Sequence, residues 1–264
     1  MALKFSLIQT HEIEGPRNEM IAPETPEIAA ENRRMVSPGL CVLIQHDTLG
    51  WILYDTGIDD QWRTGWNQTM LSLYNLKSHT NIENALSQFG LKPADIDLLI
   101  LSHLHYDHAG NVKLFQNTKA GKQILISAAE AQEAFVKVNL DDTGYSGAYL
   151  KSEFLNLEGI GYKLIDQDIQ LAPDIELFIQ KGHTPGVIGM LLRTEHNGTF
   201  LFPSDAVYAK INYGPPPVLP GICADPEAFV QNIGKLEQLR IKHNATLVFS
   251  HEYNDFKKAP YFYD

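Results

Sequence analysis

Ten residues, SHLHYDHAGN at 102–111, contain three histidines and an aspartate within six positions. The pattern is H-x-H-x-D-H, formed by His103, His105, Asp107 and His108, and it directly follows the apolar run DLLIL. Such a run predicts a buried strand, and open sheets bind their ligands in a crevice at the ends of such strands. Imidazole and carboxylate groups are common metal ligands. The pattern therefore predicts a metal site at the end of this strand.

Three further ligand-type residues stand where apolar strands are expected to end. His183 lies in the turn-rich sequence GHTPG, Asp205 ends TFLFPSD, and His251 ends LVFSH. Taken alone, a histidine at a strand end is more often structural than metal-bound, and an aspartate can cap a turn. Together with the cluster at 103–108 they form one candidate site. The remaining histidines are expected to be surface or structural residues: His11, His46, His79, His196 and His243.

Length and charge restrict the function classes. The 264 residues suffice for one large α/β domain, which we expect to span 1–264, and are marginal for two. Hydrophobic residues make up 44% of the chain, enough for a real core. The net charge of −11 argues against a nucleic-acid partner, because such a partner needs a basic surface.

No targeting or membrane segment is expected. The N-terminal sequence MALKFSLIQTHEIEG alternates like a strand and lacks the uninterrupted apolar core of a signal peptide. No run approaches the roughly 18 apolar residues of a membrane span. The two cysteines, Cys41 and Cys223, have no metal-type spacing and suggest no disulfide framework. The sequence therefore favours a reducing, cytoplasmic setting.

The hydrophobic pattern predicts two stacked sheets covered by helices. Strands are expected at 3–9, 39–47, 50–57, 95–105, 123–127, 175–184 and 245–252, with a hairpin over 188–205. Helices are expected at 81–90, at 128–138 and from the N-cap Asp225 towards the last strand. The polar segment 15–38, with four prolines, predicts a long surface loop, and residues 60–80 show no clean periodicity.

The order of the ligand-type residues resembles that of the metallo-β-lactamase superfamily, over the chain from about residue 40 to the C-terminus. The resemblance implies an α/β fold, an αββα sandwich of two mixed sheets flanked by helices, with two divalent metal ions. We expect Zn²⁺, and iron, manganese or cobalt would also fit these ligands. By this resemblance His103, His105 and His183 hold one ion, Asp107, His108 and His251 hold the other, and Asp205 bridges the two.

A narrower resemblance rests on Tyr208, three residues beyond Asp205 in SDAVY, and on the tail SHEYNDFKKAPYFYD. Both features are similar to the quorum-quenching N-acyl-homoserine lactone lactonases, which are related to 4-pyridoxolactonase and γ-butyrolactone lactonase. The resemblance implies that a metal-bridging hydroxide attacks the lactone carbonyl. Tyr208 and one ion would hold the developing oxyanion, and the other ion would take the leaving alkoxide, with Asp107 as a proton carrier.

The chain departs from this family in three places. Val187 stands where many relatives carry a second histidine after GHxPG. Segments 15–38 and 60–80 do not match, and such segments help to line the pocket in these lactonases, so the type of lactone and its acyl chain stay open. Trp62, Trp66 and Met70 are expected either to form an apolar wall for the substrate or to belong to a helix packed on the core.

Other functions compete for the same fold. A glyoxalase II-like thioesterase would share the ligands but should add a basic C-terminal region, to which the tail contributes only Lys257 and Lys258. A β-lactamase usually lacks the bridging aspartate, and a nuclease would need a basic groove. A non-enzymatic metal-binding module would leave Tyr208 unexplained. We therefore expect a small-molecule lactone as partner, no nucleic acid and no membrane, with a homodimer left open.

Overall fold

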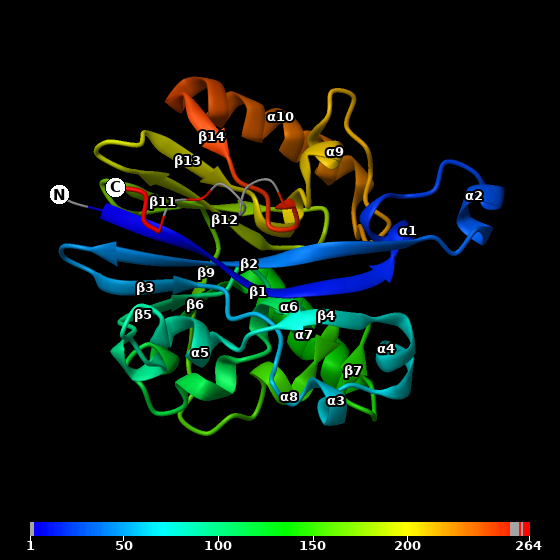
Figure 1. The fold of residues 1–264 in the computed structure, drawn as a ribbon, viewed down its shortest axis with the longest axis horizontal. Coiled ribbons are helices and arrows are strands. Elements are labelled where there is room, and N and C mark those ends of the chain that lie inside the picture. Colours follow the sequence, from blue (N-terminus) through cyan, green and yellow to red (C-terminus); the bar gives the residue numbers. More distant parts are fainter. Residues whose placement is uncertain (1–2, 254–258, 260) are drawn as a thin grey trace.

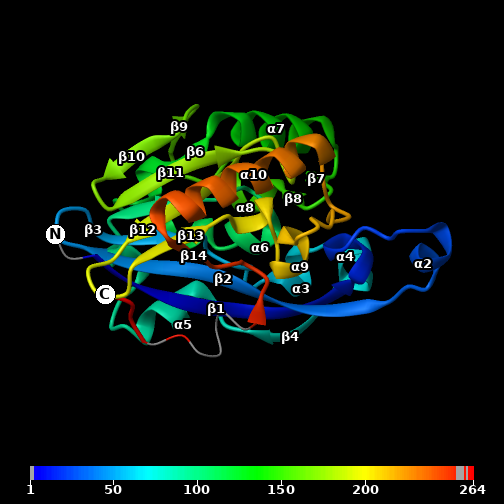
Figure 2. The same ribbon diagram turned by 90° about the horizontal axis from the view of Figure 1, so that it is seen from above.

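The computed structural model describes residues 3–253, 259 and 261–264. Two sheets pack face to face, and helices cover the outer face of each (Figures 1 and 2). The predicted αββα sandwich is confirmed. Among the described residues, no helix is both long and apolar enough to cross a membrane.

The first sheet has seven strands in the order β4-β1-β2-β3-β5-β6-β9. They are β1 (Leu3–Pro16), β2 (Arg34–His46), β3 (Gly50–Tyr54), β4 (Asn75–His79), β5 (Leu98–Ile100), β6 (Ile124–Ser127) and β9 (Tyr162–Ile165). The pairs β4-β1, β1-β2 and β2-β3 are antiparallel, whereas β3, β5, β6 and β9 run parallel. The sheet is therefore mixed.

The second sheet has five strands in the order β10-β11-β12-β13-β14. They are β10 (Ile169–Ala172), β11 (Ile175–Gln180), β12 (Val187–Arg193), β13 (Thr199–Phe202) and β14 (Ala245–Leu247). The first four strands pair antiparallel and β14 pairs parallel with β13, so β11, β13 and β14 all point the same way. A separate two-stranded ribbon consists of β7 (Tyr145–Ser146) and β8 (Tyr149–Leu150).

Two long helices and several short ones connect the strands. The helices are α1 (Arg17–Met20), α2 (Pro26–Ala30), α3 (Trp62–Gly65), α4 (Gln68–Leu73), α5 (Ile82–Ser87), α6 (Tyr106–Ala109), α7 (Ala128–Leu140), α8 (Lys151–Phe154), α9 (Lys210–Tyr213) and α10 (Pro226–His243). Short 3₁₀ turns lie at Pro93–Asp95, Val112–Phe115, Gly121–Gln123 and Ser204–Ala206. In Figure 1, α10 lies on the five-stranded sheet, and α5 to α8 lie on the opposite side of the molecule.

The alternation of side chains along the strands builds three apolar layers. In β2, Cys41 and Leu43 face the helices of the first sheet, whereas Val42 and Ile44 face the second sheet, because successive strand residues point to opposite faces. All four side chains are fully buried. A third layer joins α10 to the outer face of the second sheet. Both faces of each sheet are thus covered, which explains the nearly continuous apolar strands.

Helix α10 begins as predicted. The Asp225 side chain accepts a hydrogen bond from the backbone N–H of Ala228 at 3.0 Å, and Pro226 occupies the first helical position. The helix ends at His243 and is capped by Asn244, whose φ of 48° lies in the left-handed region.

The prediction of a long loop over 15–38 is wrong. Strand β1 continues to Pro16 and pairs with β2 from Arg34 onwards, so the two strands form a long hairpin. We call the segment between them, residues 17–33, the arm; it contains α1 and α2 and projects from the body of the molecule (Figure 1). Cross-strand pairing over 13 positions outweighs the turn propensity of the prolines, which lie at the strand end, in the arm or beside a bulge.

The other differences concern strand and helix ends. Residues 60–80 form α3, α4 and β4 rather than one continuous element. The strands expected at 95–105, 175–184 and 245–252 end earlier, at Ile100, Gln180 and Leu247. The residues that follow these shortened strands are free to leave the sheet, and they carry the candidate ligands.

Phe5 tests the contact between the two sheets. Its ring is fully buried, lies 4.9 Å from Phe200 and 5.5 Å from Phe202 across the interface, and stacks on Tyr263 at 4.7 Å. We expect Phe5→Ala to lower the free energy of unfolding by about 3–5 kcal/mol, because it leaves a cavity between the sheets. Urea denaturation would measure this, with Val230→Ala on the exposed face of α10 as control. A loss below about 1 kcal/mol would contradict this description of the core.

Candidate metal centre

All seven predicted ligand residues lie at one edge of the sandwich. His103 and His105 follow β5, with Asp107 and His108 on α6 immediately afterwards; His183 follows β11, Asp205 lies in the 3₁₀ turn after β13, and His251 follows β14. Because β11, β13 and β14 share one direction, their carboxyl ends meet at the same edge. All seven belong to two groups of side chains, each close enough to hold a metal ion.

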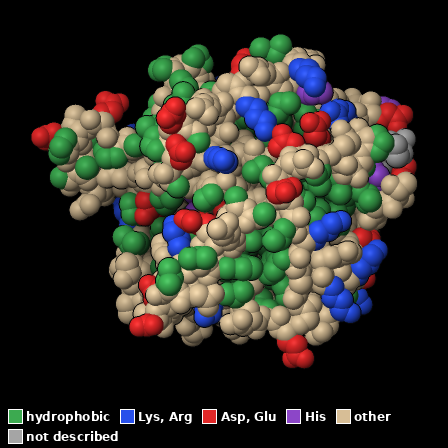
Figure 3. All heavy atoms as spheres, turned by 180° about the vertical axis from the view of Figure 1, so that it is seen from behind, with side chains coloured by type: hydrophobic (Ala, Val, Ile, Leu, Met, Phe, Trp, Pro, Cys, Tyr) green, Lys and Arg blue, Asp and Glu red, His purple; other side chains and the backbone are tan. Residues whose placement is uncertain are grey.

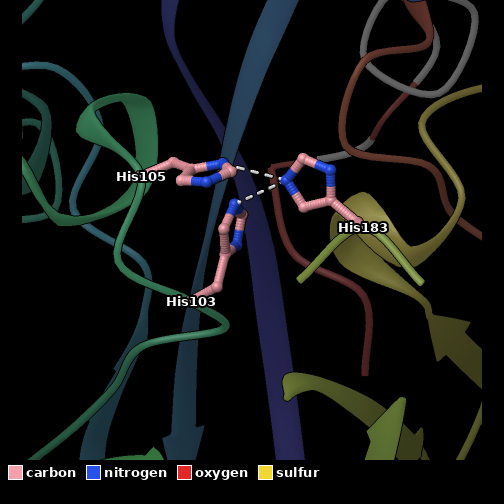
Figure 4. Close-up of side chains that lie close together, drawn as sticks. All are labelled: His103, His105 and His183. Atoms are coloured by element: carbon pink, nitrogen blue, oxygen red, sulfur yellow. Dashed lines mark hydrogen bonds between the residues drawn. The ribbon is translucent and has the colours of Figure 1, made fainter. Parts of the chain in front are cut away.

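Three histidines form the first group (Figure 4). His183 Nε2 lies 2.9 Å from His105 Nδ1 and 3.2 Å from His103 Nε2. All three side chains are buried. Two adjacent strand-end loops thus aim three nitrogen atoms at one point, and three imidazoles are a common ligand set for Zn²⁺.

The second group contains Asp107, His108, Asp205 and His251. The Nε2 atoms of His108 and His251 lie 3.7 and 3.9 Å from Asp107 Oδ2. The same two atoms lie 3.3 and 3.2 Å from Asp205 Oδ1. Three of these residues are buried, and Asp107 is the partly exposed member.

Asp205 faces both groups. Its Oδ2 lies 3.8 Å from His103 Nε2 and 3.6 Å from His183 Nε2, while its Oδ1 faces His108. His251 Nε2 lies 3.2 Å from Oδ1 and 3.3 Å from Oδ2. Ser250 Oγ donates a hydrogen bond to Oδ1 at 2.8 Å, which fixes the carboxylate plane. The single carboxylate is therefore placed to bridge two ions.

The other ring nitrogens of four histidines contact protein oxygens. His251 Nδ1 lies 2.7 Å from the carbonyl of Pro38, and His103 Nδ1 lies 3.0 Å from Ser102 Oγ. His183 Nδ1 lies 2.9 Å from the Tyr208 hydroxyl, and His108 Nδ1 lies 2.9 Å from Asp55 Oδ2. Such contacts set the tautomer and orientation of a ligating imidazole.

Sequence reasoning missed Asp55, which supports the second group. Its Oδ1 accepts the backbone N–H of Ser102 at 2.7 Å, and its Oδ2 accepts the Ser102 hydroxyl at 2.7 Å in addition to facing His108. Asp55 follows β3, which runs parallel to β5, so both strand ends reach the same place. Its φ is 64°, a conformation in which aspartate is enriched. The aspartate directly after the strand, in YDTG, was the available signal.

Glu130 was also missed. It is fully buried in α7, and its Oε1 accepts the backbone N–H of Leu104 at 2.9 Å. Leu104 separates His103 from His105, so this hydrogen bond holds the loop that presents both imidazoles. The residue lies far from the histidines in sequence, and no local pattern marked it.

Charge and burial set the protonation of the ligands. Burial lowers the pKa of His103 well below its usual value, and neighbouring histidines add to the effect. Burial opposes ionisation of Asp205, but His108 and His251 outweigh it and hold the pKa of this carboxyl well below its usual range. For His108, burial is outweighed by Asp205 and other carboxylates, which raise its pKa. A cation at this position competes with that proton, so metal affinity should fall with falling pH.

The residues fit two divalent cations. His108 Nε2 is buried and makes no hydrogen bond within the described chain, although it lies 3.3 Å from Asp205 Oδ1. In the first group, His183 Nε2 faces a nitrogen of His103 and a nitrogen of His105. A ring nitrogen either donates one hydrogen or accepts one, so His183 Nε2 can form only one of these two hydrogen bonds. A cation in each group would satisfy these atoms, in competition with the proton that His108 can carry.

Tyr208 is buried beside the centre. Burial, and then the Asp205 carboxylate, raise the pKa of Tyr208 well above its usual value, so the phenol stays protonated. Tyr208 and Asp107 line a small cavity of about 60 Å³ together with His105, His183, Asp205 and His251. Val187, in place of a second histidine, is fully buried at the start of β12 and pairs with Gln180.

A larger groove of about 640 Å³ adjoins this cavity. Met70 lines it, but Trp62 and Trp66 do not; they are buried in an apolar cluster with Ile13 and Ile58. Of the three residues considered for an apolar substrate wall, Met70 lines the groove, and the two tryptophans belong to the core. The tail motif FKKAP at 256–260 lies outside the described residues except for Ala259.

The sequence and the structure of this chain are both similar to those of known metal-dependent lactonases. The sequence matches the metallo-beta-lactamase superfamily over residues 34–251. It is 30% identical to the N-acyl homoserine lactonase AiiB of Agrobacterium fabrum, over 97% of this chain and 96% of that one. Its structure resembles an N-acyl homoserine lactone hydrolase with the product N-hexanoyl-L-homoserine at its catalytic metal centre, with a TM-score of 0.82, 26% identity and 98% of each chain covered. AidC, a dizinc quorum-quenching lactonase, shares the fold, with a TM-score of 0.68, 18% identity and coverage of 95% and 88%.

Asp55 provides a test of the site geometry. We expect Asp55→Asn to weaken metal binding about 10- to 100-fold, because the amide keeps the size of the side chain but removes the charge that orients His108. Competition with a chromophoric chelator would measure the affinity. Asp166→Asn, the same change at an exposed position that belongs to neither group of candidate ligands, is the matched control. Equal affinities in the two variants would show that Asp55 does not support the centre.

Proposed function

This chain belongs to the metallo-beta-lactamase superfamily and, within it, to the N-acyl homoserine lactonase family, and on that premise we propose that it is a dinuclear metal-dependent lactonase that hydrolyses N-acyl homoserine lactones. One observation carries the proposal: Asp205 lies between two groups of ligand side chains, with Tyr208 and the partly exposed Asp107 on the same small cavity.

The ligand chemistry supports two Zn²⁺ ions. We assign His103, His105 and His183 to one ion and Asp107, His108 and His251 to the other, with Asp205 shared between them. Nitrogen and carboxylate ligands in these numbers suit zinc, while iron, manganese and cobalt accept the same set. When bound, such ions polarise a carbonyl group and lower the pKa of a water molecule towards about 7.

Tyr208 supplies the hydrogen-bond donor for the carbonyl oxygen. With His183 Nε2 facing the cation site, Nδ1 carries the hydrogen and donates a hydrogen bond shared between the Tyr208 hydroxyl oxygen at 2.9 Å and the Ile222 carbonyl at 3.3 Å. The hydroxyl hydrogen of Tyr208 is then free to point into the cavity. As the carbonyl oxygen of the substrate gains negative charge, the hydrogen bond that it accepts from Tyr208 becomes stronger, which favours the transition state over the ground state.

Asp107 carries the proton from the attacking water to the leaving alkoxide. It is the partly exposed acid of the centre and lies on the wall of the small cavity, which would hold the ring oxygen that becomes an alkoxide when the C–O bond breaks. Water adds its oxygen to the carbonyl carbon, and the proton that water loses passes through Asp107 to the alkoxide. The product is a hydroxy acid, which ionises at neutral pH.

The cavity shapes also favour this substrate class. The inner cavity is about one tenth the volume of the outer groove, so it suits a small reacting ring attached to a longer tail. The outer groove is lined by three acidic residues, Glu19, Glu133 and Asp141, and by one basic residue, Lys137. An anionic thiol ester of the glyoxalase II type fits such a lining poorly.

Metal analysis tests the dinuclear centre. We expect two ions per chain at saturation, because seven ligands exceed the four that one tetrahedral zinc uses. Asp205→Ala should lower occupancy of both groups and remove nearly all lactonase activity. Mass spectrometry with plasma ionisation would count the ions, with the Asp166→Asn variant as control. One ion per chain at saturation, or full activity without Asp205, would refute the assignment.

Tyr208 links the site to the substrate class. We expect Tyr208→Phe to lower kcat on N-acyl homoserine lactones about 10- to 100-fold, with unchanged occupancy at saturating metal, because the ring remains and only the donor is lost. Acidification of a pH indicator would follow hydrolysis of a long-chain N-acyl homoserine lactone, a γ-lactone and a thioester. A wild-type protein that acts only on the thioester would make it a thioesterase. A variant as fast as wild type would exclude Tyr208 from the reaction.

A further inference from the structure

Glu19 stands where the inner cavity opens into the outer groove. Seven residues line both spaces: Glu19, Tyr74, His105, Tyr106, Ala148, His183 and Ile222. Of these seven, Glu19 is the single acid, and it belongs to neither group of candidate metal ligands. The carboxylate therefore lies on the path that joins the reacting centre to the space for the substrate's tail.

The carboxylate of Glu19 is held from one side. Its Oε2 accepts a hydrogen bond from the Tyr74 hydroxyl at 2.9 Å. Tyr74 in turn packs against the rings of Trp66 and Tyr106, with centroids 6.1 and 5.5 Å away. Burial raises the pKa of Glu19, and the Tyr74 hydroxyl opposes this. A carboxylate that has lost part of its hydration gains from a further N–H donor.

The backbone around Glu19 is equally fixed. Its carbonyl oxygen accepts hydrogen bonds from the backbone N–H groups of Gly221 and Ile222, at 2.9 and 3.1 Å. The carbonyl of the next residue, Met20, accepts a hydrogen bond from the Asn212 side chain at 2.9 Å. A Cβ at Gly221 would lie 1.7 Å from the Asn18 carbonyl, so only glycine allows this close approach. The arm thus presents Glu19 at a defined position.

We propose that Glu19 is a specificity-determining residue, whose carboxylate accepts a hydrogen bond from an N–H group attached to the ring carbon beside the scissile carbonyl. This inference rests on the proposed lactonase function and names the feature of the substrate that the site selects. The substrates that it selects are N-acyl homoserine lactones, as opposed to lactones that carry only an alkyl chain.

The positions of the two spaces lead to this assignment. The lactone ring has to reach the inner cavity, where Asp205 and Tyr208 lie, and the acyl chain has to occupy the outer groove. The amide attached to the lactone ring then lies where the inner cavity opens into the outer groove. At the junction this N–H meets a carboxylate that Tyr74 already orients, so little ordering is required on binding. An alkyl lactone leaves the carboxylate without this donor.

The test compares two substrates with matched tails. One is N-hexanoyl homoserine lactone, and the other is a γ-lactone with an alkyl chain of similar length and no N–H group. The variants are Glu19→Ala, Glu19→Gln and, as a matched control, Glu24→Ala, which removes an exposed acid from the same arm. Metal content and thermal unfolding of each variant would establish that the centre and the fold persist.

We expect Glu19→Ala to lower kcat/KM for the N-acyl homoserine lactone about 10- to 100-fold, the usual effect of losing a hydrogen bond to a charged group. The γ-lactone should change less than about threefold. Glu19→Gln, which keeps an acceptor oxygen, should fall between Glu19→Ala and wild type on the amide substrate. Glu24→Ala should match wild type on both substrates.

Other outcomes overturn the inference. An equal loss on both substrates would make Glu19 a residue that shapes the pocket, and no loss on either would remove it from recognition. A wild-type protein that hydrolyses the γ-lactone but not the amide substrate would refute both this inference and the proposed N-acyl homoserine lactone substrate, and would leave a lactonase of another specificity. A metal-loaded wild type that hydrolyses no lactone at all would refute the proposed function itself, and the inference with it.

Discussion

The candidate centre depends on the contacts between the buried carboxylate of Asp205 and the histidines around it. A charge removed from water is unfavourable unless partners surround it, and here four imidazoles from both sheets do so. Asp205 Oδ2 faces His103 and His183, Oδ1 faces His108, and His251 Nε2 lies close to both oxygens, so the carboxylate stands between the two groups of ligands. His103 and His108 come from the first sheet, and His183 and His251 from the second. The centre therefore forms only when the two sheets pack together.

Strand direction explains why so few residues are needed to build this centre. Three strands of the second sheet and one of the first deliver their ligands between three and eight residues after the last strand residue, where the backbone has left the sheet. The immediate support is equally compact: Asp55 orients His108, and Glu130 holds the loop between His103 and His105. Rigid elements thus set the ligand positions, and the loops stay short enough to add little disorder.

Selectivity has a different origin. The ligands and the fold are shared by enzymes that act on many substrates, so they do not define the substrate by themselves. In this chain the arm contributes Glu19, and the residue that follows α4 is Tyr74; both line the junction of the two spaces. Figure 3 shows acidic side chains at the tip of the projecting arm as well. The chemistry of the centre and the choice of substrate are therefore carried by separate parts of the chain.

The sequence alone determined the parts of this protein that depend on local patterns. The spacing of His103, His105, Asp107 and His108 after an apolar strand is visible within ten residues, and so are the turns that carry His183 and Asp205. The cap at Asp225 and the alternation in β2 are equally local. These features predicted the sandwich and identified the seven candidate ligands.

Only the tertiary structure decided the rest, because it depends on contacts between distant segments. The pairing of Pro16 with Arg34 turned an expected loop into a hairpin with an arm, since cross-strand hydrogen bonds outweigh local turn preference. Burial of Trp66 against Tyr106 placed it in the core instead of the substrate wall. Asp55 became visible as the partner of His108 only when β3 lay beside β5. Local spacing marks the candidate ligands, whereas pairing over long sequence separations decides what surrounds them.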